Sequence, residues 1–565
     1  MLEDDTDTAF AVQAEIDTKG NVLGSKGGVA VQSGIARAEE DQLPGRDGNE
    51  NTPLLGEGGG NGGAPAWEGA KDFEGLPWYK RPSIFYMLGP FFLMTLAFGG
   101  IIAPKLNLLL NLICREYISE QQSLDPGFTM IPVLFDGSDN EQCRIPEVQA
   151  RVARFTLYGN LIAGLLSAIT SPKLGALSDR YGRTKMLMIT SMGTIAGDII
   201  TVCAATNPET FPVNWILLGF ALDGICGSFI AAMAIANAYA SDCTPPALRN
   251  VAFGYFHACL FTGIALGPIL AAFIIKVTES NVSVFYVALG VHAFFILFLA
   301  FVKALAGPSS DFINQIRAIN LFEPLKILWP TGEGSFPALR RNLVFLAAVD
   351  TILFGVAMGS MTVIIIYTNY EFGWGTYQSS IFMSVVNCCR TLGLIVVLPT
   401  ITRLVRGKNA AAKLKSSGTD NFELAIIRTA VFFDTLGYLG YALARTGPLM
   451  ILSGAIASIG GIGSPTLQAA LTKHVPSDRT GQLLGASGLL HALARVVAPT
   501  IFNAIYAATV GKFTQTVFVC LTCTFGVAFI LSWFVRPHVY LHEAGDTPPQ
   551  TSDGGDTEIR ERIGA

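Results

Sequence analysis

Charged residues are scarce in this sequence. Asp, Glu, Lys and Arg make up only 14% of the 565 residues, against roughly a quarter in soluble domains. Hydrophobic residues reach 51%, and they fall in blocks of about twenty residues, the length of helix that crosses a hydrocarbon core of about 30 Å. A soluble protein would show shorter, amphipathic runs. The composition therefore argues against a soluble protein and predicts an all-α membrane protein.

Several chemical signatures are also missing. The ten cysteines show no paired metal spacing and no disulfide framework, since Cys388 and Cys389 are adjacent within an apolar block and Cys143 lies far from any block. There is no G-x-x-x-x-G-K-[ST] phosphate loop, no nucleophile–base pair and no His-rich cluster. The start, Met1 to Asp7, is acidic and has no apolar stretch, which predicts that no cleavable signal peptide is present. We expect no enzymatic activity, no metal, no cofactor and no nucleic-acid partner.

The apolar blocks predict twelve spans between two polar tails. The N-terminal tail contains the run GEGGGNGG at residues 56–63, which cannot bury a core, and the C-terminal tail is similar. The predicted parts are a disordered tail (1–81), a six-helix bundle (82–305), a central loop (306–341), a second six-helix bundle (342–536) and a disordered tail (537–565). The predicted spans are 84–103, 152–172, 186–205, 214–239, 252–275, 284–305, 342–366, 377–400, 424–444, 448–471, 483–509 and 515–535.

Lys and Arg are unevenly distributed between the loops. One set of alternate loops is rich in them, whereas the other set holds only Lys276, Arg445 and Lys512 beyond the long loop after the first span. The positive-inside rule puts the rich set, both tails and the central loop in the cytoplasm. The sequon at Asn281 then lies outside, close to the membrane, as a weak glycosylation candidate.

The N-terminal tail contains a possible sorting signal. Glu50, Leu54 and Leu55 fit the acidic dileucine pattern [DE]xxxL[LI]. Short patterns of this kind are common by chance. If this one is used, it indicates a vacuolar or endosomal membrane, and otherwise we expect the plasma membrane.

The chain has the marks of a duplication. Gly254, Gly263, Gly267 and Pro268 of the fifth span are matched, 231 residues later, by Gly485, Ala494, Ala498 and Pro499 of the eleventh. Pro245 matches Pro476 at the same offset. Two repeated halves with a site at their interface are typical of transporters.

The turn between the second and third spans carries the strongest motif. Gly175, Leu177, Asp179, Arg180, Gly182 and Arg183 are spaced as G-x-L-x-D-R-x-G-R. A carboxylate among these cations can pair with Arg or cap a neighbouring helix N-terminus, closing the cytoplasmic side. A basic anchoring loop would explain the cations, but not the Gly and Asp spacing.

Over residues 84 to 535 the sequence resembles the major facilitator superfamily, whose signature in this loop is G-x-L-a-D-r-x-G-r. The resemblance implies twelve transmembrane helices in two pseudo-symmetric six-helix bundles, a multi-pass protein that works as a monomer, and alternating access driven by a gradient. The segments 111–117 and 239–244 are similar to the branch that contains proton-coupled folate transporters and their fungal relatives. The chain also resembles the tetracycline-type antiporters.

The fifth span bears on the direction of transport. Its Gly254, Gly263, Gly267 and Pro268 resemble the family's antiporter motif, which favours export, although a Gly/Pro face also serves plain helix packing. Drug–proton antiporters of the family carry an Arg four residues before a Gly in span four, where this chain has Asp223 before Gly227. That departure weakens the case for proton antiport.

Ionisable residues inside spans are the best site candidates, because each is costly unless it is paired or faces water. We predict that Asp223 and Asp350 face a central cavity, with Arg390 and Arg495 within reach, and that a carboxylate there exchanges between a proton and an Arg. The alternative is a static salt bridge. The residues favoured as structural are Asp198, Asp434, His257, His292 and His491.

Beyond Pro104 the first span continues as an amphipathic helix. Asn107, Asn111 and Arg115 form one polar stripe, which predicts either the outer mouth of the cavity or a helix lying on the bilayer.

The sequence therefore predicts a secondary transporter in the lipid bilayer. It moves a small organic molecule by alternating access, coupled to protons, with export favoured. The alternatives are proton-coupled uptake and a transporter-like receptor, against which the short tails argue.

Overall fold

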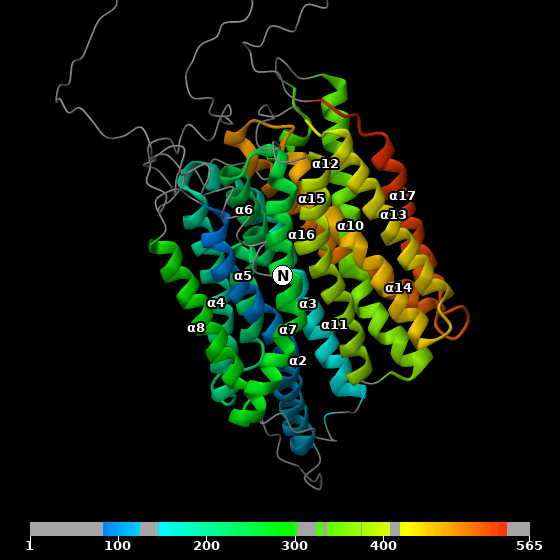
Figure 1. Cartoon of the computed structure of the whole chain (residues 1–565). Coiled ribbons are helices and arrows are strands. Elements are labelled where there is room, and N and C mark those ends of the chain that lie inside the picture. Colours follow the sequence, from blue (N-terminus) through cyan, green and yellow to red (C-terminus); the bar gives the residue numbers. More distant parts are fainter. Residues whose placement is uncertain are drawn as a thin grey trace, which may run out of the picture. The chain divides into compact units, whose positions relative to one another are not determined.

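The chain folds into long helices (Figure 1). The computed structural model describes residues 83–124, 143, 146–301, 324–331, 336–374, 376–406 and 418–539. Within these residues no strand is present, which confirms the all-α prediction. The helices are α2 (Ile84–Leu124), α3 (Pro146–Tyr181), α4 (Arg183–Thr206), α5 (Trp215–Ile225), α6 (Ser228–Cys243), α7 (Arg249–Thr278), α8 (Val282–Phe301), α10 (Pro337–Phe372), α11 (Thr376–Leu392), α12 (Leu398–Arg406), α13 (Asn421–Leu443), α14 (Gly447–Ile459), α15 (Gly463–Thr472), α16 (Thr480–Thr509) and α17 (Thr516–Trp533).

In the part of the chain that the structure describes, eleven helical segments are long and apolar enough to cross a membrane. The remaining predicted span, 424–444, is α13, whose Arg428 and Asp434 make it less apolar and which packs against α14 and α17. Three spans contain a break: α5 with α6, α11 with α12 through the π-helical turn η6 (Gly393–Val397), and α14 with α15 through the short helix η8 (Gly460–Ile462).

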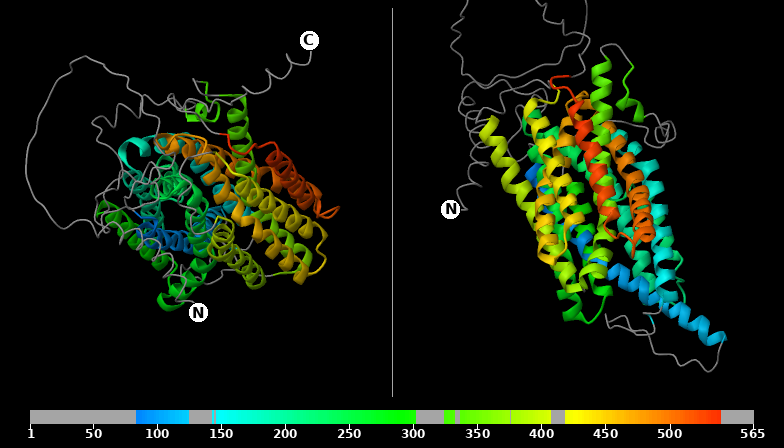
Figure 2. Two further views of the ribbon diagram at one scale, coloured as in Figure 1. Left: turned by 45° about the horizontal axis from the view of Figure 1, so that its top comes forward. Right: turned by 90° about the vertical axis from the view of Figure 1, so that its right-hand side faces the viewer.

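The helices form two groups, called here the N-half (α2–α8) and the C-half (α10–α17), which lie side by side in Figures 1 and 2. The C-half has a large apolar core of its own, and the N-half has two. Small clusters join the halves, for example Ala258 of α7 with Leu394 and Leu398 of the C-half. Separate cores with small bridging clusters allow the halves to move as units.

The glycines of the fifth span are packing positions. A Cβ at Gly263 would overlap the carbonyl of Thr95 in α2, and a Cβ at Gly267 would meet the backbone of Gly99 and Gly100. Gly254, in contrast, faces Leu398 of the C-half, where a Cβ would lie 3.0 Å from the side chain. Small residues let α7 and α2 approach to backbone contact, as in other membrane helix pairs.

The fourth span is interrupted between α5 and α6. Gly227 has φ of 90° and Ser228 has φ of 56°, a left-handed bend that favours glycine. Hydroxyls of α3 satisfy the freed carbonyls, since Ser167 donates to the oxygen of Gly227 at 2.8 Å and Thr170 to that of Gly224 at 2.9 Å. Broken helices at membrane depth require such partners.

One disulfide corrects the sequence analysis. Cys114 and Cys143 are bonded, with Cα atoms 5.4 Å apart, although no disulfide framework was expected. Because α2 continues to Leu124 without interruption, Cys114 lies on its extension and meets Cys143 just before α3. The spacing of the cysteines in the sequence predicts neither the extension of α2 nor the proximity of Cys114 and Cys143.

The extension of α2 packs on the N-half. Leu108, Leu112 and Ile113 are buried in one cluster with Val148 and Val152 of α3. The apolar side of the stripe therefore faces protein, and the alternative of a helix lying on the bilayer is wrong. Asn107 of the polar stripe is exposed, whereas Asn111 is buried.

Several predictions fall on positions that the structure leaves out or buries. The tail 1–81, with Glu50, Leu54 and Leu55, most of 537–565 and most of the central loop lie outside the described residues. Asn281 is only 1% exposed at the start of α8, which argues against glycosylation there.

We predict that Gly263→Ala destabilises the protein, because its methyl group overlaps the α2 backbone. Overpacking of this kind costs about 1–3 kcal/mol. Gly290→Ala is the matched control, since no atom lies within 4 Å of a Cβ built there. Thermal unfolding in detergent should show a lower midpoint for Gly263→Ala alone. Equal midpoints for the two variants would contradict the packing role.

Candidate functional site

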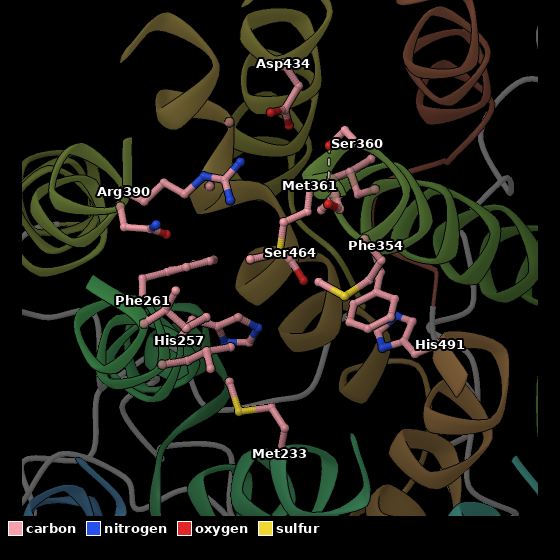
Figure 3. Close-up of a pocket in the computed structure, with 18 of the residues that line it drawn as sticks. Met233, His257, Phe261, Phe354, Ser360, Met361, Arg390, Asp434, Ser464 and His491 are labelled. Atoms are coloured by element: carbon pink, nitrogen blue, oxygen red, sulfur yellow. Dashed lines mark hydrogen bonds between the residues drawn. The ribbon is translucent and has the colours of Figure 1, made fainter. Parts of the chain in front are cut away.

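A cavity of about 210 Å³ lies between the two halves (Figure 3). The N-half contributes α6 and α7, and the C-half contributes α10, α11, α13, α15, α16 and α17 together with η8. Both halves therefore form the walls of one pocket, as expected for a site at the interface of two repeats.

The two walls differ in polarity. The N-half wall is apolar apart from His257, and includes Met233, Leu260 and Phe261. The C-half wall holds the other polar groups of the lining, which are Ser360, Asn387, Arg390, Asp434, Tyr438, Tyr441, Ser464, Gln468, Ser487 and His491. A ligand that fits both walls has one apolar side and one polar side.

Arg390 and Asp434 are positioned by the glycine pair in η8. A Cβ at Gly460 would overlap the carboxylate of Asp434, and a Cβ at Gly461 would lie 3.2 Å from Cγ of Arg390. The guanidinium carbon of Arg390 lies over the ring of Phe261, 5.3 Å from its centroid. Among the described residues no carboxylate lies within 4.0 Å of Arg390, and its Nε atom is buried without a hydrogen-bond partner.

Asp350 lies behind the pocket wall, beside His491. Its Oδ2 is 3.0 Å from Nε2 of His491, although the geometry is not that of a hydrogen bond, and Ser464 donates to its Oδ1 at 3.3 Å. Asp350 is only 1% exposed, and the His491 ring stacks on Phe354 at 4.4 Å. Asp350 therefore reaches the pocket through His491 and Ser464, which line it.

His257 faces the pocket from the N-half. Its Nδ1 lies 2.9 Å from the carbonyl oxygen of Phe253, so this nitrogen carries the hydrogen and Nε2 is the acceptor. The sequence favours a structural role for His257, His491 and Asp434, but all three line the pocket. A lone His on an apolar helix carries no signal of its partner, since His491 and Asp350 are far apart in the chain.

Asp223 and Arg495 are not among the residues that line the pocket. Asp223 accepts a hydrogen bond from Thr194 of α4 at 3.0 Å, in a second polar cluster with Asp198 and His292. Arg495 lies within electrostatic reach of Asp223. Of the four predicted residues, Arg390 therefore lines the pocket, Asp350 lies behind its wall in contact with His491 and Ser464, and Asp223 and Arg495 lie away from it.

The glycine-rich turn between α3 and α4 joins the halves. Asp179 accepts hydrogen bonds from the backbone amides of Gly481 and Gln482, at 2.9 and 2.8 Å, in the first turn of α16. An anion there stabilises the helix N-terminus. Gly175 allows the contact, because a Cβ would overlap the backbone of Gly481. This is the capping that the motif predicted.

Arg183 completes the arrangement. Its guanidinium contacts Asp179 at 2.5 Å and Asp242 of α6 at 2.8 Å, and it is buried. Gly182 has φ of 100°, a conformation that favours glycine at the turn into α4. Arg180, the remaining motif cation, is exposed.

Further hydrogen bonds cross between the halves at the same end, called here the basic end. Asn237 donates to Gln468 at 2.5 Å, Arg249 to Thr472, and Arg406 to the carbonyl of Ala247. The basic end is therefore closed. A side-chain hydrogen bond between the halves that lies away from this end joins Thr262 and Thr391.

The C-half has its own ion pairs at the basic end. Arg406 pairs with Asp420 at 2.6 Å, and Lys473 pairs with the buried Glu423 at 2.5 Å. Burial lowers the pKa of Lys473, whereas Glu423 raises it. Burial lowers the pKa of His474 to about 4, so His474 is neutral near pH 7.

Comparison with known proteins identifies the family to which the chain belongs. The sequence model of the Major Facilitator Superfamily matches residues 153–499. The chain belongs to this family. Its members transport molecules across membranes, which confirms the predicted fold class and a transporter rather than an enzyme.

Among curated relatives, the MFS-type transporter avaJ of Aspergillus versicolor is 32% identical over 81% of this chain and 89% of its own. The class C tetracycline resistance protein of Escherichia coli is 28% identical (68% and 85% covered), and the proton-coupled folate transporter of Rattus norvegicus is 24% identical (66% and 77%). The crystal structure of the human organic anion transporter MFSD10 has a TM-score of 0.59 at 17% identity, covering 81% of this chain and 100% of that one. The predicted resemblance to the folate and tetracycline branch is confirmed.

We predict that Asp179→Asn loosens the basic end. Losing the charged cap costs about 1 kcal/mol or more, roughly a fivefold change in the ratio of closed to open forms. Asn237 is buried against Gln468 in the closed form. A single cysteine placed at Asn237, in a chain whose free cysteines are replaced by serine, therefore reacts with a thiol reagent from the open form, and its reaction in Asp179→Asn should be severalfold faster. Asp478→Asn, at an exposed position, is the control. An unchanged reaction rate in Asp179→Asn would reduce the motif to an anchoring loop.

Proposed function

We propose that this protein carries a small organic molecule across a membrane by alternating access, with the cavity between the halves as its binding site. The observation that carries the proposal is that both halves line the cavity while their hydrogen bonds close the basic end. Opening that end requires the bonds of Asp179, Asn237 and Arg406 to break together. Rocking of the halves about the cavity then exposes it to the other side.

The basic end is proposed to face the cytoplasm. The positive-inside rule supports this orientation. The disulfide supports it independently, because Cys114 lies thirty residues along α2 from Ile84, at the end opposite Ser83, which contacts Tyr239 at the basic end. Disulfides persist outside the cytosol. The structure then represents a state that is closed toward the cytoplasm.

Proton coupling is proposed to use Asp350 and His491. The pair borders the pocket and lies in the interior, where a proton can pass between carboxylate, imidazole and ligand. His491 belongs to α16, the helix whose first turn is capped by Asp179, so one helix connects the closure of the basic end to the titratable pair. A relative named for proton-coupled transport is consistent with this role.

Export is the favoured direction. The span-five motif resembles that of antiporters, and one relative is named for tetracycline resistance, a property that removal of the compound would give. Proton-coupled uptake is the alternative and would use the same pocket. Purified protein in sealed vesicles with an imposed pH gradient, tested against a panel of small organic molecules, distinguishes the two by the direction of movement. Absence of gradient-dependent movement for every member would contradict the proposal.

We predict that Asp350→Asn abolishes accumulation driven by a pH gradient but retains exchange of substrate across the vesicle membrane, because binding remains while the proton site is lost. Asp223→Asn is the comparison, since Asp223 lies outside the pocket. The Asp223→Asn variant should retain accumulation driven by the pH gradient. Gradient-driven accumulation by Asp350→Asn would contradict a coupling role for Asp350. Loss of accumulation in Asp223→Asn alone would assign proton coupling to the second polar cluster instead.

A further inference from the structure

The cationic group of the pocket is available to a ligand. Arg390 projects from α11 into the pocket, as Figure 3 shows. Asp434 lies within electrostatic reach of it, but no carboxylate lies within 4.0 Å of its guanidinium in the described chain. Its guanidinium carbon lies over the Phe261 ring, 5.3 Å from the centroid. The N–H groups of a guanidinium form the fork that matches a planar oxyanion.

The anion of the pocket is set further back. Asp434 is 6% exposed, and its carboxylate lies against Gly460, whereas Arg390 is less buried. In Figure 3 Asp434 is also further than Arg390 from His257 and Met233 of the opposite wall. Of these two charged groups, the guanidinium is therefore the one nearer the N-half wall.

The rest of the lining suits a flat apolar body. Phe229, Phe261 and Phe354 contribute rings, and Met233, Met358 and Met361 contribute flexible thioethers that adapt to irregular shapes. Aromatic rings held between such side chains gain both burial and stacking.

We infer that the pocket takes an organic anion that has a planar oxyanion, such as a carboxylate or an enolate, paired with Arg390, and a flat apolar body against the N-half wall. The inference rests on the proposed function in that it names the substrate class of the same pocket. Asp434 acts as the opposing charge, which disfavours a second anionic group and accepts a hydrogen bond from a ligand hydroxyl or amine.

Binding to the purified full-length protein tests this class without a membrane or a gradient. The probes are planar aromatic monocarboxylates, each with its methyl ester and with the amine of the same ring system. The tightest binders should be acids, preferred over their own esters by about tenfold, the order expected for a charge-assisted bidentate pair.

Variants assign the preference to Arg390. In Arg390→Gln the ratio of acid to ester affinity should fall to about one, and Arg390→Lys should retain part of it, because Lys keeps the charge but not the fork. Asp434→Asn should raise acid affinity, since it removes a like charge. Arg428→Gln is the matched control, because Arg428 also lies over a ring, that of Trp533, but does not line the pocket.

Three results would overturn the inference: no acid binds at millimolar concentration, esters or amines bind more tightly than acids, or the acid preference persists in Arg390→Gln. If Arg390→Gln does not fold, the other two variants still test the inference. Arg390→Lys should lower the preference for the acid, and Asp434→Asn should raise the affinity for the acid. Failure of the proposed function is distinguishable, since an acid that binds but is never moved contradicts transport alone. A transported cation that outcompetes the acids contradicts the substrate class alone.

Discussion

The carboxylate of Asp179 at the first turn of α16 is the interaction on which the arrangement of the two halves depends. A helix N-terminus leaves amide groups without partners, and here two of them are satisfied by a side chain from the other half. The contact is possible because glycines bring the α3 and α16 backbones together. Arg183 holds the carboxylate in place and ties it to Asp242. Everything that faces the pocket from α16, including His491, is aligned by this junction.

The internal repeat explains how one bundle design supplies two different walls. Asn237 and Gln468 occupy equivalent positions 231 residues apart and bond to one another across the interface. At another equivalent pair, Asp242 is held by Arg183 in the N-half, whereas Lys473 is held by Glu423 in the C-half. At this pair of equivalent positions the charge is inverted between the two halves. In the pocket, likewise, most polar groups belong to one half and the apolar face to the other.

Sequence patterns predicted the features that are local. Apolar blocks identified the spans, and the spacing of Asp179 among glycines and cations predicted a helix cap, because the motif itself specifies a tight turn. Features that depend on distant segments were missed. The Cys114–Cys143 bond requires the full length of α2, and the His491–Asp350 pair requires α10 and α16 to pack together. Asp223 was assigned to the pocket from its depth in the span, which does not reveal that its side chain meets Thr194 in α4.

The central claim is that the pocket is closed toward the basic end and reached from the other. Ser487 lines the pocket, and it is 4% exposed. In a chain whose free cysteines are replaced by serine, Ser487→Cys provides a single thiol there. Impermeant thiol reagents applied to oriented vesicles should modify it from the side of the Cys114–Cys143 disulfide and much more slowly from the basic side. Equal or faster modification from the basic side would contradict the account.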